Sequence, residues 1–415
     1  MLRAIFPTAL VLSFGLHLSA QAPFPTASPG SVGIIPERLA ATPKLLQEHI
    51  NEGKIAGASY LILRQGRLVE QRQFGLANLD NRTPMRSDTI FRIYSMTKPI
   101  TSVAALQLVE QGRLNLNDPI TRWLPELEGL KVYRENAASE ELTEANPITV
   151  RMLLNHTAGF TYDFFEGSPV HELYKQQNLW SSADLDDFIQ RVAKLPLLSA
   201  PGTAFNYSIG LDVLGALIER VAHEPFPSYL DRHIFQPLGM EDTGFNVPDE
   251  KRSRLATIHQ LNTSGKLETT TAILGAYAEA GKGIPSGGGG LFSTINDYAR
   301  FAQMLLNKGT FRGERILGRK TVELALQNSL TTTSTPYNSF SPSDGWGLLG
   351  AVRLDVGRSG ELGSEGMFYW SGAATTHFFV DPTEGLIGLV FTQHIPFDQH
   401  NLFSPFRNTV YQALE

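Results

Sequence analysis

Ser95-Met96-Thr97-Lys98-Pro99-Ile100-Thr101 stands between a short strand-like segment, Ile90 to Ile93, and an apolar run that continues to Glu110. The run predicts a buried helix that ends at Gly112. Pro99 suits the first turn of such a helix, where its missing N–H costs nothing. We therefore expect a strand, a tight turn and a long core helix at this point of the chain.

Ser95 and Lys98 are three positions apart and share one face of the predicted helix. The Lys98 ammonium can then reach the Ser95 hydroxyl, and the helix N-terminus adds positive partial charge beside it. A serine beside a desolvated lysine can act as a nucleophile. The alternative is an N-cap serine with a solvated lysine, and this segment alone favours that alternative slightly.

Strand patterns occur on both sides of this segment and return in the last third of the chain. The predicted elements are a helix from Pro36 to Glu52, strands at Ala58–Leu63 and Leu68–Gly75, strands at Trp346–Leu354, Ala374–Val380 and Leu386–Thr392, and a closing helix from Asn401 to Leu414. Polar loops at 131–147 and 329–345 are expected on the surface. The order predicts a sheet lobe from residues 23–94 and 286–415 and a mainly helical lobe from residues 95–285, with a ligand site between them.

The composition narrows the classes of protein. The chain has 415 residues, 18% of them charged and 42% hydrophobic, which excludes a mostly disordered protein. A net charge of -6 argues against nucleic-acid binding. The absence of cysteine excludes disulfides, thiolate metal sites and a cysteine nucleophile.

The N-terminus resembles an export signal. Arg3 supplies positive charge, Ala4 to Leu16 is almost wholly apolar, and Ser19-Ala20 offers small residues before a cut at Gln21. A buried N-terminal helix is the alternative. We expect residues 1–20 to be a signal peptide, a periplasmic or secreted mature protein, and no stable membrane insertion after cleavage.

Common catalytic and nucleotide-binding motifs are missing. The chain has no G-x-S-x-G, no H-E-x-x-H and no phosphate-binding G-x-x-x-x-G-K-[ST]. The glycine run Gly287 to Gly290 lacks a following lysine, so we interpret it as backbone freedom before a helix near Ser293. Neither a metal ion nor an organic cofactor is predicted.

Several further segments resemble one family when taken in order. They are Leu153 to Gly159, Pro201-Gly202 to Tyr207-Ser208, Pro237 to Met240 with Asp242-Thr243, Gly287 to Asp297, and Tyr369 to Ala374. Together with the Ser95 segment they resemble the class C β-lactamase and penicillin-binding-protein superfamily, and most of all the family VIII carboxylesterases. The resemblance covers roughly residues 30 to 412.

The resemblance implies an α/β (α+β) fold of the β-lactamase/transpeptidase type: an antiparallel sheet flanked by the terminal helices, plus a helical lobe. It also implies roles. Ser95 would carry the acyl group, Lys98 would take or relay its proton, and Tyr207 would act as general base. The backbone N–H groups of Ser95 and Ala373 would form the oxyanion hole, with Ala373 on an edge strand.

Departures from the lactamase pattern bear on the substrate. Ile209 stands where those enzymes have an asparagine that binds an acyl-amide carbonyl. Trp370-Ser371-Gly372 stands where they have Lys-Thr-Gly, so the cation for a substrate carboxylate is missing. The tryptophan matches family VIII esterases, which usually have Trp-Gly-Gly, and Ser371 keeps a hydroxyl where lactamases have threonine.

Other residues are candidates for the pocket wall. The aromatic segment around Phe160 and Tyr162 either packs in a satellite core or lines an acyl site, and Trp346 could form the opposite wall with Trp370. His156 is more often structural than catalytic in such a setting.

These features predict an exported serine carboxylesterase whose partner is a small-molecule ester of short to medium acyl length. A β-lactamase or D-Ala-D-Ala peptidase, an acyltransferase, and a non-catalytic binding protein on the same fold are the alternatives. The joint presence of Ser95, Lys98 and Tyr207 argues against the last. No oligomeric state is predicted.

Overall fold

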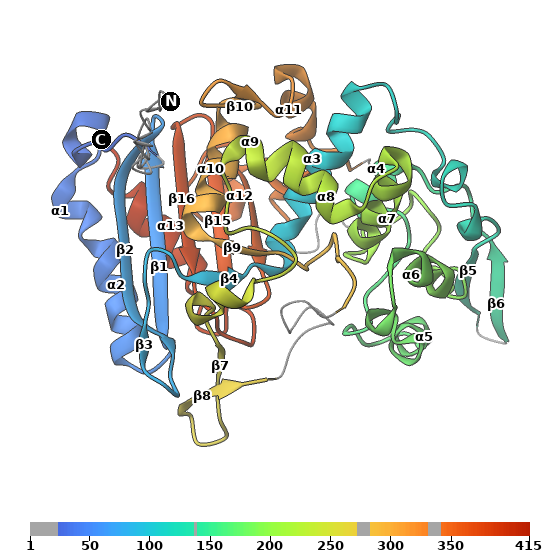
Figure 1. Ribbon diagram of the computed structural model, residues 1–415, viewed down its shortest axis with the longest axis horizontal. Helices are drawn as coiled ribbons and strands as arrows, with labels where there is room; N and C mark the ends of the chain where they lie inside the picture. The colour runs from blue at the N-terminus through green and yellow to red at the C-terminus, as the bar shows by residue number, and fades with distance from the viewer. Residues whose placement is uncertain (1–23, 137–138, 272–282, 331–341) are drawn as a thin grey trace, which may run out of the picture.

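The computed structural model describes residues 24–136, 139–271, 283–330 and 342–415, and its largest feature is an eight-stranded antiparallel sheet (Figure 1). The strand order is β12-β13-β14-β15-β16-β1-β2-β3. The bounds are β12 Asp344–Trp346, β13 Ala351–Arg353, β14 Phe368–Gly372, β15 Thr376–Asp381, β16 Leu386–Phe391, β1 Gly57–Arg64, β2 Arg67–Asn78 and β3 Thr83–Pro84. Strands from the two ends of the chain thus meet where β1 pairs with β16.

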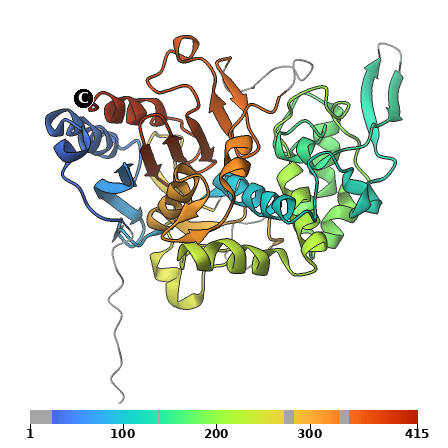
Figure 2. The ribbon, with the colours of Figure 1, turned by 90° about the horizontal axis from the view of Figure 1, so that it is seen from above.

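Helices cover both faces of the sheet, which explains why its central strands are apolar on both sides. The terminal helices α1 (Pro36–Leu39), α2 (Ala41–Asn51) and α13 (Phe403–Tyr411) pack on one face. Helix α10 (Ile295–Leu306) packs on the other against β1, β15 and β16, as the view from above shows (Figure 2).

Helix α3 (Thr97–Glu110) is buried from Thr97 to Leu108, so it is a core helix with no solvent face over most of its length. It leads into the helical lobe and packs against α7. The helices of that lobe are α4 Val150–Leu154, α5 Pro169–Gln177, α6 Leu185–Val192, α7 Gly210–Ala222, α8 Phe226–Leu230 and α9 Gln236–Leu238, joined by a π turn at Asp231–Phe235. None of the helices in the described ranges has the length and apolar character needed to cross a membrane.

Smaller elements complete the chain. Short antiparallel pairs are β4 Ile90–Arg92 with β9 Phe292–Thr294, β5 Lys131–Asn136 with β6 Ser139–Glu144, β7 Ile258–Leu261 with β8 Leu267–Thr270, and β10 Thr310–Phe311 with β11 Glu314–Arg315. Two further helices are α11 Arg319–Ala325 and α12 Val356–Ser359, and 3-10 turns lie at η1 Pro29–Val32, η2 Tyr94–Met96, η3 Ile120–Arg122, η4 Pro125–Leu127, η5 Leu179–Ser181 and η7 Asp249–Arg254.

Four predicted segments differ from the structure. The helix predicted from Pro36 to Glu52 is two helices that meet at Ala40. The strand predicted over Trp346–Leu354 is a hairpin, since Gly347 to Gly350 turn the chain between β12 and β13. The predicted loop 131–147 contains the β5–β6 hairpin. Part of the predicted loop 329–345 lies outside the described residues, and its described end at Ser343 to Asp344 is buried.

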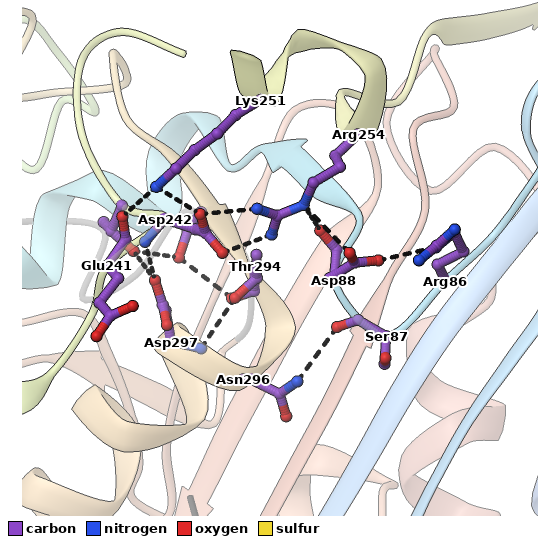
Figure 3. Close-up of polar contacts among 12 residues, drawn as sticks. Arg86, Ser87, Asp88, Glu241, Asp242, Lys251, Arg254, Thr294, Asn296 and Asp297 are labelled. Carbon is purple, nitrogen blue, oxygen red and sulfur yellow. Dashed lines mark hydrogen bonds and ion pairs between the residues drawn. The ribbon is translucent and has the colours of Figure 1, made fainter. Parts of the chain in front are cut away.

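A polar cluster fixes the segment that follows α9 to the sheet lobe (Figure 3). Arg254 donates to both carboxylate oxygens of Asp242 at 3.0 and 2.5 Å, and its Nε lies 3.4 Å from Asp88. Asp297, in the first turn of α10, accepts from the backbone N–H of Asp242 at 2.8 Å and from the Thr243 hydroxyl at 3.0 Å. These contacts tie residues 241–254 to the start of α10 and to the loop before β4.

Candidate active site

Ser95 lies in the 3-10 turn between β4 and α3 and lines a pocket with mostly apolar walls. Tyr94, directly before it, has φ 42°, an uncommon left-handed conformation for a residue with a side chain. The N-cap of α3 is Met96, and no side chain caps this helix end. Ser95 is therefore not a capping serine.

Lys98 points from the first turn of α3 toward Ser95. Its Nζ donates to Ser95 Oγ at 3.2 Å and to the Gly288 carbonyl at 2.6 Å, and the side chain is only 2% exposed. Burial lowers the pKa of the ammonium to about 7, against the opposing charge of Asp212. A lysine with this pKa can give up and take back a proton at neutral pH.

Tyr207 brings a second proton-carrying group to the same place. Its ring lies under Lys98, with Nζ 4.4 Å from the ring centroid, and its hydroxyl is hydrogen-bonded to Ser95 and lies 3.4 Å from Trp370 Nε1. Burial raises the pKa of Tyr207, and the hydrogen bonds from Ser95 and Trp370 oppose the rise only in part. The phenol therefore stays protonated at neutral pH.

His156 packs against the Tyr207 ring and binds the main chain beside it. Its Nδ1 accepts the Ser208 N–H at 3.3 Å, its carbonyl accepts the Asn206 N–H at 2.8 Å, and its ring packs 4.7 Å from the Tyr207 ring. Burial holds the pKa of His156 well below its usual range. The imidazole is neutral and acts as a structural support.

Gly372 brings strand β14 against the Ser95 turn. A Cβ at Gly372 would lie 2.3 Å from the Ile93 carbonyl oxygen, so only glycine allows this approach. Ala373 follows in the turn between β14 and β15 and lines the pocket. The prediction that it lies on an edge strand is wrong, since β14 has β13 and β15 as neighbours.

The pocket around Ser95 has a volume of about 470 Å³. Aromatic side chains from two loops line it, and those of Phe164 and Phe397 are 48% and 50% exposed. Tyr162 and Trp370 also line it. Glu361 and Arg407, which form an ion pair, line it as well.

Four residues predicted to contact substrate do not line this pocket: Ile209, Phe160, Trp346 and Gly372, the last of which is buried against Ile93. Ile209, Phe160 and Trp346 are 0, 0 and 1% exposed and belong to the main hydrophobic core. Trp346 lies directly behind Trp370, with ring centroids 4.4 Å apart. Trp346 therefore supports the wall that Trp370 forms, whereas Ile209 and Phe160 are core residues.

Ser371 does line the pocket, and its hydroxyl is 2.8 Å from Nδ1 of His377 on β15. Burial holds the pKa of His377 well below its usual range, so the partner of Ser371 is a neutral imidazole. In the described ranges, no group of three or more His, Asp or Glu side chains is arranged to hold a metal ion.

Sequence reasoning missed Asp212 and Gly288. Asp212 stands in the first turn of the apolar helix α7, is 0% exposed, and accepts at Oδ1 from Ser286 and from the Gly288 N–H, the latter at 3.0 Å. The available signals were a carboxylate in the apolar first turns of α7 and a glycine run that borders a buried strand. Gly288 is required for contact, since its Cβ would lie 2.4 Å from Asp212 Oδ2.

A two-lobed fold with Ser95, Lys98 and Tyr207 converging on one pocket defines a class of enzyme, the serine hydrolases that use a Ser-x-x-Lys pair. The chain belongs to the Beta-lactamase family, whose model matches residues 42–401. It is a serine hydrolase of the β-lactamase and penicillin-binding-protein superfamily. The predicted β-lactamase/transpeptidase-like fold is thereby confirmed.

Similar proteins with described activities include an esterase, a hydrolase and a synthase. Esterase EstB of Burkholderia gladioli is 31% identical over 392 residues, which is 89% of this chain and 93% of EstB. The structure of EstCE1, "a hydrolase with promiscuous acyltransferase activity", is 30% identical with a TM-score of 0.79 and covers 90% of this chain and 99% of its own. Simvastatin synthase LovD of Aspergillus terreus is 26% identical with a TM-score of 0.78, covering 90% of this chain and 98% of its own.

Proposed function

We propose that this protein is an exported carboxylesterase that hydrolyses short to medium acyl esters through an acyl-enzyme on Ser95. The observation that carries the proposal is the buried Lys98 amine, 3.2 Å from the Ser95 hydroxyl and in its protonation range at neutral pH. Export rests on the signal-like sequence of residues 1–20, which lie outside the described residues.

In the acylation step, the neutral Lys98 amine takes the proton of Ser95 as Oγ attacks the ester carbonyl. The carbonyl oxygen becomes an oxyanion that the N–H groups of Ser95 and Ala373 would stabilise. Collapse of this intermediate breaks the bond to the alcohol oxygen. The Lys98 proton returns to that oxygen through the Tyr207 hydroxyl, and the alcohol leaves.

Deacylation repeats these transfers with water in place of the alcohol. Water adds to the acyl carbon and loses a proton through Tyr207 to Lys98, and Ser95 regains a proton as the acid leaves. Because Tyr207 has a raised pKa, its role here is relay of a proton rather than service as a standing phenolate. This assigns the base to Lys98 and departs from the role expected for Tyr207 from the family resemblance.

The pocket wall favours an ester over a lactam. Trp370 occupies the position of the lactamase lysine, and its ring and the neighbouring aromatic side chains offer apolar contact in place of a cation. A short activated ester needs only the nucleophile and the oxyanion donors. The esterase among the similar proteins supports the same substrate class.

Acyl transfer is the second candidate, because an alcohol can replace water in the deacylation step. The partly exposed aromatic residues Phe164 and Phe397 offer a surface on which an apolar alcohol can bind. The similarity to EstCE1, a hydrolase with promiscuous acyltransferase activity, supports this alternative. Partition of one acyl-enzyme between water and an added alcohol would measure it.

A labelling experiment tests the nucleophile. A fluorophosphonate should add its mass to the tryptic peptide that contains Ser95, and Ser95→Ala should lose both label and ester hydrolysis. Label on a different serine, or full activity of Ser95→Ala, would disprove the mechanism.

A substrate panel tests the reaction class. Nitrophenyl acetate and butyrate, a chromogenic cephalosporin and a D-Ala-D-Ala peptide should be compared at one enzyme concentration. We expect efficient ester hydrolysis, at most trace opening of the cephalosporin and no cleavage of the peptide. A kcat/KM for the cephalosporin equal to that for nitrophenyl butyrate would favour a lactamase instead.

A further inference from the structure

Asp212 and Lys98 are joined through the main chain of one residue, Gly288. The Gly288 N–H donates to Asp212 Oδ1 at 3.0 Å, and the Gly288 carbonyl accepts from Lys98 Nζ at 2.6 Å. Asp212 therefore holds Gly288 by its N–H group, and Gly288 holds Lys98 by its carbonyl group. Ser286, two residues earlier, donates its hydroxyl to the same carboxylate oxygen.

The second oxygen of this carboxylate is free of hydrogen bonds. Asp212 Oδ2 is buried without a hydrogen-bond partner and faces the α-carbon of Gly288. A buried carboxylate with an unpaired oxygen costs free energy, so it is expected only where its charge or its geometry has a use.

We propose that Asp212 is a positioning residue for acyl transfer, which fixes the Lys98 amine beside Ser95 through the Gly288 main chain and supplies the negative charge that balances it. The inference rests on the function proposed above. Asp212 makes no contact with Ser95 in the described structure and does not line the pocket, so it acts through Lys98.

Among the titratable groups around Lys98, Asp212 is the one whose negative charge can balance the ammonium. The titratable groups around Lys98 are Asp212 from α7, Tyr207 before α7, His156 and Tyr162 from the segment after α4, and Tyr94 from η2. Tyr207 and Tyr94 have raised pKa values and His156 a lowered one, all through burial, so these three are neutral at pH 7. Burial raises the pKa of Asp212, and the charge of Lys98 together with the two hydrogen-bond donors on Oδ1 opposes that rise.

The test compares Asp212→Asn with the wild type. The variant keeps an oxygen that can accept from Gly288 and Ser286 and removes only the charge. Loss of an opposite charge lowers the pKa of a buried lysine, so the acidic limb of the kcat/KM profile should move to lower pH by about one unit. On the plateau, kcat should fall about tenfold or more, with KM within about twofold.

One control separates this role from an effect on general stability. Asp297→Asn neutralises another buried carboxylate, away from the pocket, and should leave the acidic limb in place. The rate of fluorophosphonate labelling of Ser95 against pH gives the same profile without any assumption about the substrate.

The outcomes are distinct. An acidic limb that stays at the wild-type pH in folded Asp212→Asn overturns the proposal. If that variant does not fold, Gly288→Ala replaces it, because a Cβ there displaces the carboxylate, and an unmoved limb again overturns the proposal. A wild-type protein that is not labelled at Ser95 instead disproves the proposed function itself.

Discussion

Burial of a single ammonium sets the pH range in which the site can work. Because the pKa of Lys98 is lowered to about 7, its neutral, proton-accepting form dominates above pH 7 and disappears below it. We predict that kcat/KM for nitrophenyl butyrate rises tenfold per pH unit below about 7 and levels off above it. A rate that stays constant from pH 5 to 8 would exclude Lys98 as the base.

Tyr207→Phe tests the proton relay. The ring, its packing on His156 and its position under Lys98 are retained, and only the hydroxyl is lost. We expect kcat to fall by roughly 10²–10⁴-fold, with an unchanged circular dichroism spectrum. Near-normal turnover in this variant would remove Tyr207 from the mechanism.

Ile209 shows how a family pattern can mislead at a single position. The lactamase asparagine suggests a side chain in contact with substrate, but Ile209 is fully buried in the core. We predict that Ile209→Asn lowers the free energy of unfolding by about 3 kcal/mol or more and gains no cephalosporin hydrolysis. Ile209→Val, which should cost only about 1 kcal/mol, is the control in urea unfolding.

The order of the motifs identified Ser95, Lys98 and Tyr207. It did not identify Asp212 and Gly288, whose contact forms only in the folded chain. Ser95 and Lys98 carry a spacing that can be recognised in one helix turn, and Tyr207 follows from its place in the series. Asp212 and Gly288 meet only because α7 and the glycine run are adjacent in three dimensions. No spacing in the sequence records that contact.

At the scale of elements, apolar runs predicted the central strands and the core helix well. Errors fall where short elements meet, at Ala40 between α1 and α2 and in the turn at Gly347 to Gly350. Strand β14 was expected only from the family resemblance, and at the sheet edge rather than in the interior. A short strand in the interior of a sheet is apolar without a long alternating pattern, so periodicity cannot separate it from a turn.

The polar cluster at the start of α10 makes stability depend on pH (Figure 3). Burial raises the pKa of Asp297 to about 6, above its value in the unfolded chain. Its stabilising contribution is therefore complete below about pH 4 and is lost as the pH rises through 6, a change of roughly 2–3 kcal/mol. Asp297→Asn keeps an acceptor for the Asp242 N–H and cannot ionise.

We predict that Asp297→Asn matches the wild type in urea unfolding near pH 4 and exceeds it in free energy of unfolding near pH 8. Asp88→Asn, which changes an exposed carboxylate of the same cluster, should show no such gain at high pH. An Asp297→Asn protein that is less stable than the wild type at pH 8 would show that the ionised carboxylate is stabilising there.

At the scale of the whole molecule, strands from the two ends of the chain pair in the sheet lobe. The N-terminal segment from Phe24 to Ala27, called the anchor here, makes contacts of its own with this lobe. Phe24 is buried with its ring 5.7 Å from that of Phe311, and Leu68 of β2 exchanges backbone hydrogen bonds with Pro25 and Ala27 at 2.8 and 2.9 Å. The anchor begins after the proposed signal peptide, so cleavage before Gln21 leaves it intact.

This arrangement predicts different effects for two truncations. A protein that begins at Gln21 should equal the full chain in free energy of unfolding and in kcat/KM. Removal of residues 1–28 deletes the buried Phe24 ring and both backbone hydrogen bonds, and should cost about 3–5 kcal/mol. Urea unfolding of both forms measures the difference, and Phe24→Ala in the Gln21 form should reproduce most of it. Equal stability of the two truncated proteins would show that the segment before η1 contributes nothing to the fold, and that a cut further along the chain would be tolerated as well.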